Sequence, residues 1–118
     1  MAQPETLLQA EIMAAVGALD GVVVWRNNIG TAASAVSGRR VAYGVGGPGA
    51  PDLLCEVRTA SGVWAAVWME VKTLTGALRP DQRRWHEAAR ADGRHVEVVR
   101  SVDHALEIVQ TFRGVRHG

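Results

Sequence analysis

Two apolar segments separated by a short turn are the strongest constraint on the fold of this 118-residue chain. Residues 52–58 and 63–72 are rich in valine, leucine and tryptophan, and residues 59–62 between them have the composition of a turn. This pattern predicts two long strands that pair as an antiparallel hairpin. Such pairing places Asp52, at the start of the first strand, beside Glu70, near the end of the second.

The acids at this end of the hairpin, together with a lysine, predict a metal site. Glu70 and Lys72 are two residues apart on one strand, so both side chains point to the same face. Two carboxylates suit Mg²⁺, which takes one or two protein carboxylates along with waters and phosphate oxygens. A neighbouring ammonium can orient a water or stabilise charge on a phosphate. Together these groups indicate phosphodiester hydrolysis, although Pro51-Asp52 is also an ordinary strand start and Glu-x-Lys is common on solvated strands.

Two further polar residues are in phase with apolar helix faces. Glu5 lies near the angle of the apolar stripe of a helix expected over residues 5–19, whereas Glu11 lies well off that stripe. Gln82 shares a face with Trp85 in a helix expected over residues 79–92. It lies at the N-terminus of this helix, a position that can face a phosphate. The alternative for Glu5 is a first-turn acid that stabilises the helix dipole, and for Gln82 a solvated first-turn residue.

The remaining patterns predict a mixed α/β or α+β fold in one domain over residues 1–118. The first helix is followed by strands, then by the second helix, a strand and a C-terminal helix over residues 102–112. The further strands are expected at residues 22–26, 39–43 (short) and 95–99, with a loop at 27–38 and a glycine-rich loop at 44–51.

Several residues have simpler interpretations. Gly44 to Gly49 match G-x-G-x-x-G, but the segment leads into a strand instead of a helix, which argues against a dinucleotide site. The glycines instead allow a close backbone approach to a substrate strand. Cys55 is expected in the core and His86 on a helix surface, while the four tryptophans are expected mostly in the core.

The charge balance excludes proteins that coat nucleic acid by bulk electrostatics. The chain has 13 basic and 12 acidic residues, a net charge of +1, and Lys72 is its one lysine. Arginines near the predicted site can still form a local phosphate track. The single cysteine excludes an internal disulfide, and the lack of a long apolar run or a basic leader leads us to expect a cytoplasmic protein without a membrane partner.

Taken together, these motifs resemble the VRR-NUC domain of the PD-(D/E)xK nuclease superfamily, in the stand-alone form encoded by phages or bacteria. The resemblance covers nearly the whole chain. It rests on five segments: Arg26-Asn27-Asn28-x-Gly30, the glycine-rich loop into Pro51-Asp52, Glu70-Val71-Lys72-x-x-x-Gly76, Pro80-x-Gln82-x-x-Trp85, and Arg100-Ser101-Val102. Arg79 departs from the family pattern, which commonly has a serine cap there.

The resemblance implies a restriction-endonuclease-like core of order α-β-β-β-α-β and DNA cleavage that depends on Mg²⁺, with Mn²⁺ as a substitute and no small-molecule cofactor. Asp52 and Glu70 would bind the metal, with the Val71 carbonyl as a further ligand. Glu5 would be the first-helix acid that joins them, with Glu11 as the alternative for that role. Lys72 would position the water, and Gln82 would be the helix glutamine of the motif. The residues expected to contact DNA are Arg26, Asn28, Arg39, Arg40, Arg79 and Arg83.

Similarity to stand-alone family members also implies a homodimer that acts on branched DNA such as Holliday junctions. Two alternatives remain open: a nuclease-like module that binds DNA without cutting it, and a nuclease that acts on plain duplex. A two-fold dimer would supply the two active sites that the two scissile strands of a junction require.

Overall fold

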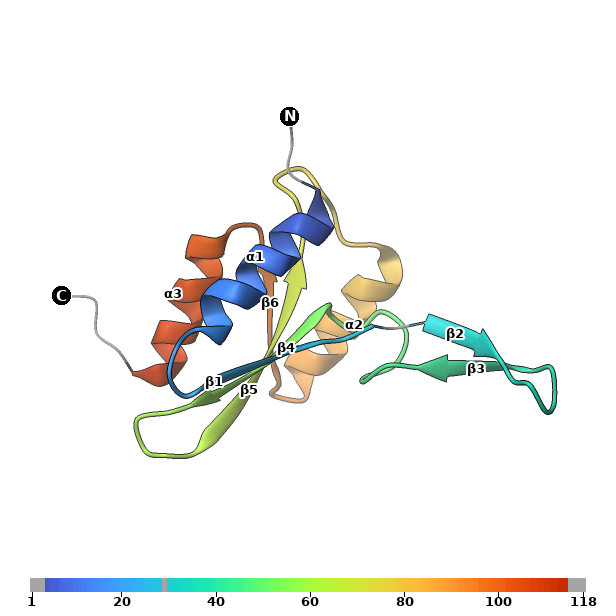
Figure 1. The fold of residues 1–118 in the computed structure, drawn as a ribbon, viewed down its shortest axis with the longest axis horizontal. Coiled ribbons are helices and arrows are strands. Elements are labelled where there is room, and N and C mark those ends of the chain that lie inside the picture. Colours follow the sequence, from blue (N-terminus) through green and yellow to red (C-terminus); the bar gives the residue numbers. More distant parts are fainter. Residues whose placement is uncertain (1–3, 29, 115–118) are drawn as a thin grey trace.

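The computed structural model describes residues 4–28 and 30–114 and has a four-stranded mixed sheet with helices on both faces (Figure 1). The helices are α1 (Glu5–Gly17), α2 (Pro80–Ala91) and α3 (Val102–Arg113). The strands of this sheet lie in the order β1-β4-β5-β6, with bounds β1 (Val22–Arg26), β4 (Leu53–Arg58), β5 (Trp64–Val71) and β6 (His95–Val99). The expected α-β-β-β-α-β order with a C-terminal helix is confirmed for this core.

The central hairpin has the predicted topology. β4 pairs antiparallel with β5 from Leu53 opposite Met69 to Arg58 opposite Trp64. β1 pairs antiparallel with β4, and β6 pairs parallel with β5 after the crossover through α2. This register places the start of β4 beside the end of β5, as the sequence pattern required.

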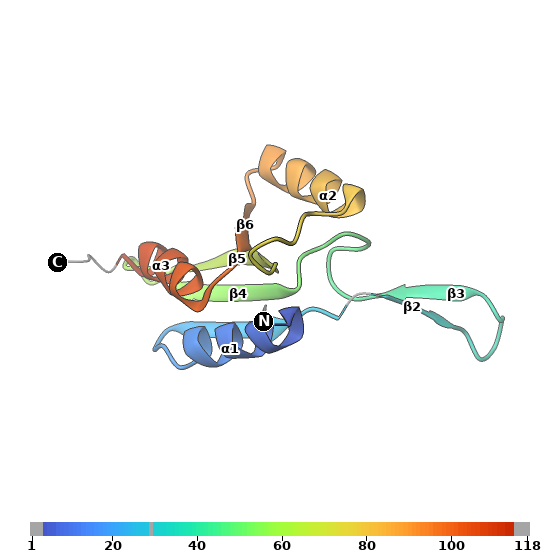
Figure 2. The same cartoon turned by 90° about the horizontal axis from the view of Figure 1, so that it is seen from above.

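The two faces of the sheet are covered differently. On one face, alternate residues of β4 and β5 pack against α1 and α3 in the main core, which includes Ile12, Leu53, Met69 and Val109. Figure 2 shows α1 and α2 on opposite sides of the sheet. Because α2 covers the second face near its end, residues 67–71 of β5 are all buried, whereas Trp64 near the strand start is exposed.

The segment expected as a loop over residues 27–38 contains an additional strand. β2 (Gly30–Ala33) pairs antiparallel with β3 (Arg40–Tyr43), and the two form a separate hairpin that projects from the main sheet (Figure 1). The glycine- and serine-rich composition concealed β2, because small residues have weak strand preference. Its pairing partner, β3, is the short strand predicted at 39–43. Ile29 lies outside the described residues.

Candidate active site

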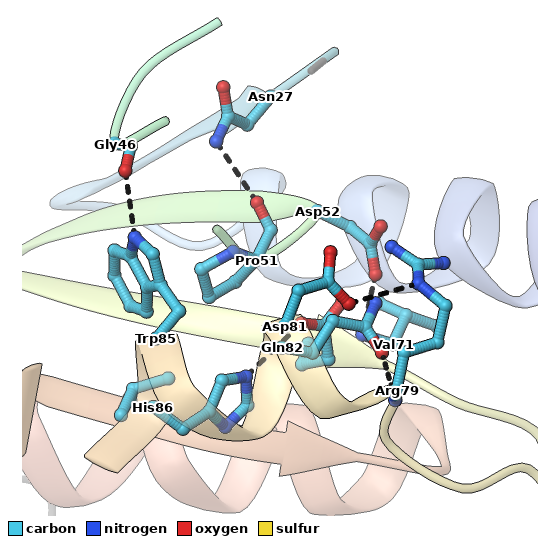
Figure 3. A network of polar contacts seen from close by, with 12 residues as sticks. Asn27, Gly46, Pro51, Asp52, Val71, Arg79, Asp81, Gln82, Trp85 and His86 are labelled. Carbon is cyan, nitrogen blue, oxygen red and sulfur yellow. Dashed lines mark hydrogen bonds and ion pairs between the residues drawn. The ribbon is translucent and has the colours of Figure 1, made fainter. Parts of the chain in front are cut away.

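The structure brings the two predicted acids together at the end of the central hairpin. Asp52 directly precedes β4, and its Oδ2 accepts a hydrogen bond of 2.9 Å from the backbone N–H of Val71. This bond ties Asp52 to the strand that carries Glu70 (Figure 3). Lys72 follows directly, is only 6% exposed, and donates its backbone N–H to Val99 O at 3.0 Å. The predicted juxtaposition of Asp52, Glu70 and Lys72 therefore exists in the fold.

Glu70 is fully buried, which is unusual for a carboxyl group. Its Oε1 lies 3.1 Å from Nε2 of His86 on α2, and its Oε2 is buried without a hydrogen-bond partner. Burial, and then the neighbouring carboxyl of Asp52, raises the pKa of Glu70 from 4.5 to about 9. A cation beside these carboxyls would restore the ionised form, because it would offset the charge that burial penalises.

His86 does not lie on the helix surface, and that expectation is wrong. Its side chain is 1% exposed and packs under α2 against the sheet. Burial, followed by the positive charges of Arg90 and Lys72, lowers the pKa of His86. The available signal was the spacing of Gln82, His86 and Ala89 at i, i+4 and i+7, which defines one helix face. All three residues are buried in α2.

A cavity of about 290 Å³ opens beside Asp52 and includes several of the predicted site residues. Glu5, half-buried at the start of α1, reaches it, which confirms that this residue is close to the buried helix face; Glu11 is exposed. Gln82 and Arg79 at the start of α2 complete the opposite wall. Glu70 lies behind Asp52 and does not line the cavity. The lining residues are Glu5, Gly30, Pro48, Gly49, Ala50, Asp52, Arg79, Asp81 and Gln82.

Gln82 has a structural role that sequence reasoning did not predict. Its Oε1 accepts the backbone N–H of Arg79 at 2.9 Å, which satisfies a donor just outside the first turn of α2. The side chain is 5% exposed, so the alternative of a solvated first-turn residue is wrong. Arg79 caps nothing with its own side chain, which instead contacts Asp81 at 3.3 Å. The glutamine thus compensates for the missing serine cap.

The glycine-rich loop is held against α2 and against β1 by specific contacts. Asn27 Nδ2 donates to Val45 O at 2.8 Å and to Pro51 O at 3.0 Å, and its Oδ1 accepts Val45 N–H at 2.9 Å. Trp85 Nε1 donates to Gly46 O at 2.8 Å. A Cβ on Gly49 would lie 2.5 Å from the backbone O of Asp81, so the close backbone approach here is to α2. These contacts position Asp52 from its N-terminal side.

The arginines and the asparagine expected to contact DNA do not gather in one place. Arg79 lines the cavity, and Arg83 is exposed one turn further along α2. Arg26 and the exposed Asn28 lie at the end of β1, where Arg26 lines a second cavity of about 290 Å³ with Trp25 and Val45. Arg39 and Arg40 are exposed at the β3 side of the projecting hairpin (Figure 2).

The donor set fits a divalent cation of the Mg²⁺ type. Glu70 Oε2 is buried without a partner, the Glu70 carboxyl interacts with the Asp52 carboxyl, and buried polar atoms without partners call for a ligand. Within residues 4–28 and 30–114 there is no cluster of three or more histidine, cysteine or acidic side chains arranged for a metal. A site with two carboxylates that leaves the other positions to water and phosphate is typical of Mg²⁺.

The main core supplies a rigid base for these groups. Cys55 is buried there, as expected, and burial raises its pKa to about 12, so the thiol is inert at neutral pH. Of the four tryptophans, Trp68 is buried and packs edge-to-face on Trp85 at 5.1 Å, but Trp25 and Trp64 are exposed. The expectation that the tryptophans are mostly core residues therefore holds for Trp68 and Trp85, which pack between α2 and the sheet, but not for Trp25 and Trp64. In the described part of the chain, no helix is long and apolar enough to cross a membrane.

Comparisons with known proteins agree with this architecture. No curated protein matches the chain. A solved structure described as a VRR_NUC domain is 28% identical, superposes with a TM-score of 0.57, and the match covers 92% of this chain and 96% of that one. The mixed sheet of this chain, flanked by helices, matches that structure and is consistent with a restriction-endonuclease-like fold. The sequence model of the VRR-NUC domain matches residues 5–103, most of the chain. The chain therefore belongs to the VRR-NUC domain family, a branch of the nuclease superfamily.

Proposed function

We propose that this protein is a metal-dependent endonuclease that hydrolyses DNA phosphodiesters and prefers branched DNA. The observation that carries the proposal is the buried Glu70 carboxyl, with one unpartnered oxygen, beside Asp52 and Lys72. Family membership supports a nuclease fold, and this site supplies the chemistry that such a fold needs. A structural role alone would not explain three buried or half-buried charged groups at one strand end.

In this proposal Asp52 and Glu70 hold Mg²⁺, with Mn²⁺ as a functional substitute. When bound, the cation would polarise a phosphate oxygen and lower the pKa of a water. The Val71 carbonyl is a further proposed ligand, because the Val71 peptide is tied to Asp52 through its N–H. Glu5 lines the same cavity and is proposed to orient a water there.

In this proposal Lys72 acts on the attacking water or the phosphate, and Gln82 supports the cavity wall. Lys72 directly follows β5, two residues after Glu70, and its charge acts on the Glu70 carboxyl, so its ammonium can hold the attacking water or a phosphate oxygen. Gln82 keeps the N-terminal turn of α2 ordered at the cavity wall through its contact with Arg79. The exposed arginines would bind the DNA backbone with a strong dependence on salt.

The first test compares cleavage of a four-way junction and of plain duplex in Mg²⁺, Mn²⁺ and EDTA, with Asp52→Asn as the inactive variant. We expect nicks near the branch point with either metal, no cleavage in EDTA, and a faster rate on the junction. Equal rates on both DNAs would favour the duplex nuclease. Junction binding without metal-dependent nicking would favour the non-cleaving module, and an active Asp52→Asn protein would refute the proposed site.

A homodimer belongs to the same proposal. A junction presents two scissile strands and this fold presents one cavity with the Asp52 carboxylate, so paired cleavage needs a second copy. Light scattering at micromolar concentration should give twice the mass of the chain, and a strictly monomeric mass would contradict this part. The cleavage test above does not depend on it.

A further inference from the structure

His86 is the buried residue beside the site to which the proposed function gives no role. It projects from α2 one turn after Gln82, and its Nε2 is 3.1 Å from Glu70 Oε1. The geometry points to His86 as a positioning residue that holds the Glu70 carboxylate with Oε2 free to bind the divalent cation. This inference rests on the proposed metal site, and it adds the residue that sets the orientation of one ligand.

The proton arrangement follows from which atoms lack partners. His86 Nδ1 and Glu70 Oε2 are both buried without hydrogen bonds. A proton on Nδ1 would bury an unpaired N–H, and orphaned buried N–H groups are rarer in proteins than under-satisfied acceptors. The favoured neutral imidazole therefore carries its proton on Nε2 and donates it to Glu70 Oε1. The second carboxylate oxygen is then the one left for a cation.

The ring is held in place by the packing of α2. At the start of the helix the Gln82 cap and the contact of Gly49 with Asp81 fix its position. Further along, Trp85 packs on Trp68, and Arg90 Nη2 donates to Val96 O at 3.1 Å. A donor on a rigid helix loses little freedom when it orients a ligand. His86 therefore holds the Glu70 side chain in one orientation.

Two amide substitutions separate this role from simple packing. Glutamine places its amide where Nε2 lies, whereas the shorter asparagine reaches only the Nδ1 position. We expect His86→Asn to weaken Mn²⁺ binding, measured by calorimetric titration, by about 10- to 100-fold, the usual loss when an outer-shell partner is removed. We expect His86→Gln to bind Mn²⁺ within about fivefold of the wild type, because it keeps the donor.

The same variants give a second readout in cleavage. If the residue acts through metal binding, His86→Asn should raise the Mg²⁺ concentration for half-maximal rate, while the rate at saturating Mg²⁺ recovers to within about tenfold. His104→Asn, on α3 and away from the cavity, is the matched control and should change neither value. If His86→Asn does not fold, His86→Leu fills the space without a donor and takes its place.

The results that would overturn the role of His86 differ from those that would overturn the proposed nuclease function. The positioning role would be overturned if folded His86→Asn, or His86→Leu in its place, bound Mn²⁺ with wild-type affinity. Equal weakening of Mn²⁺ binding in this variant and in His86→Gln would also overturn it. A wild-type protein that binds Mn²⁺ but cuts no DNA would refute the nuclease proposal and leave the metal titration of the variants to decide the role of His86. A wild-type protein that binds no divalent cation would overturn both.

Discussion

The β4–β5 hairpin has two ends with opposite surroundings. At the end that carries Asp52 and Glu70, α2 and the glycine-rich loop cover the strands, and Glu70 contacts His86 at 3.1 Å with both side chains buried. At the other end, Arg58 faces Asp20 at 3.8 Å with both side chains exposed, and Trp64 is 49% exposed. The exposed ion pair contributes little, because water screens it.

The difference shows that the strand pair alone does not make a site. Charged residues occur at both ends of the hairpin, but only at the covered end are they removed from water. Burial raises the pKa of Glu70 and leaves its Oε2 without a partner, and a cation at this oxygen would satisfy it and favour the ionised carboxylate. Matched substitutions at the two ends therefore test whether covering by α2 is what matters.

The largest contrast is expected for the two cationic side chains at the hairpin ends. Lys72→Met should lower the single-turnover cleavage rate at saturating Mg²⁺ by about 10²- to 10⁴-fold, because the ammonium acts on the water or phosphate. Arg58→Met, at the far end, should change the rate by less than about twofold, since its exposed ion pair is weak. A Lys72→Met protein that cuts at near wild-type rate would remove Lys72 from the mechanism.

The next contrast is the pH dependence of stability without metal. Because the folded-state pKa of Glu70 is raised from 4.5 to about 9, the folded protein keeps a proton that the unfolded chain releases between these values. The free energy of unfolding should therefore fall as pH rises through this window, by at most about 1.4 kcal/mol per pH unit. Glu70→Gln lacks this loss and should become increasingly more stable than wild type toward pH 9.

Urea unfolding in EDTA from pH 5 to pH 9 measures this difference. Near pH 5 the two proteins should be most alike. Adding Mn²⁺ at pH 8 should stabilise the wild type more than Glu70→Gln, since only the ionised carboxylate is a full ligand. A stability difference that stays constant with pH would show that Glu70 does not hold its proton in the fold.

Two glycines with the same φ of +86° provide a matched pair for packing. Gly49 faces α2, where a Cβ would lie 2.5 Å from Asp81 O, whereas Gly62 in the β4–β5 turn has nothing within 4 Å. Gly62→Ala should cost about 1 kcal/mol of stability from backbone strain alone. Gly49→Ala should cost about 3 kcal/mol, because it adds a clash with the helix. Equal losses in thermal unfolding would mean that the loop and α2 separate easily.

The smallest contrast concerns the polar residues that secure each end. Asn27→Ala removes three side-chain hydrogen bonds to residues 45 and 51 and should cost about 1–3 kcal/mol. Thr59→Ala removes the bond of 2.7 Å from Thr59 Oγ1 to Val63 O in an exposed turn and should cost about 0.5–1.5 kcal/mol. Chemical denaturation measures the free energy of unfolding of both variants. A larger loss for Thr59→Ala than for Asn27→Ala would contradict the prediction that the covered end is held more firmly.

Sequence periodicity predicted most of the core elements to within two residues. Alternation in residues 52–58 and the turn at 59–62 were enough for the hairpin, because side-chain period and turn composition are local properties. The juxtaposition of Asp52 with Glu70 followed from antiparallel pairing. The sequence did not predict β2, because a short segment of small residues has little strand preference of its own and forms a strand only by pairing with β3.

One side chain of α2, His86, could not be placed from the sequence. Gln82 and Trp85 were assigned to the buried face, but His86, one residue after Trp85, was assigned to solvent. Helix phase alone leaves an uncertainty of about one residue, which is 100° of rotation. The packing of α2 against β5 resolves this uncertainty, because it directs the His86 ring toward the Glu70 carboxyl, 3.1 Å away.

By itself, the sequence determined which chemical groups come to the end of the hairpin: two carboxylates and a lysine at spacings that only strand pairing can unite. It also determined family membership, because the sequence model of the VRR-NUC domain matches residues 5–103. Only the tertiary structure decided that Glu70 is buried, that His86 contacts it, and that Gln82 caps the helix. The physical reason is that burial depends on what packs from distant segments, whereas strand geometry repeats locally along the chain.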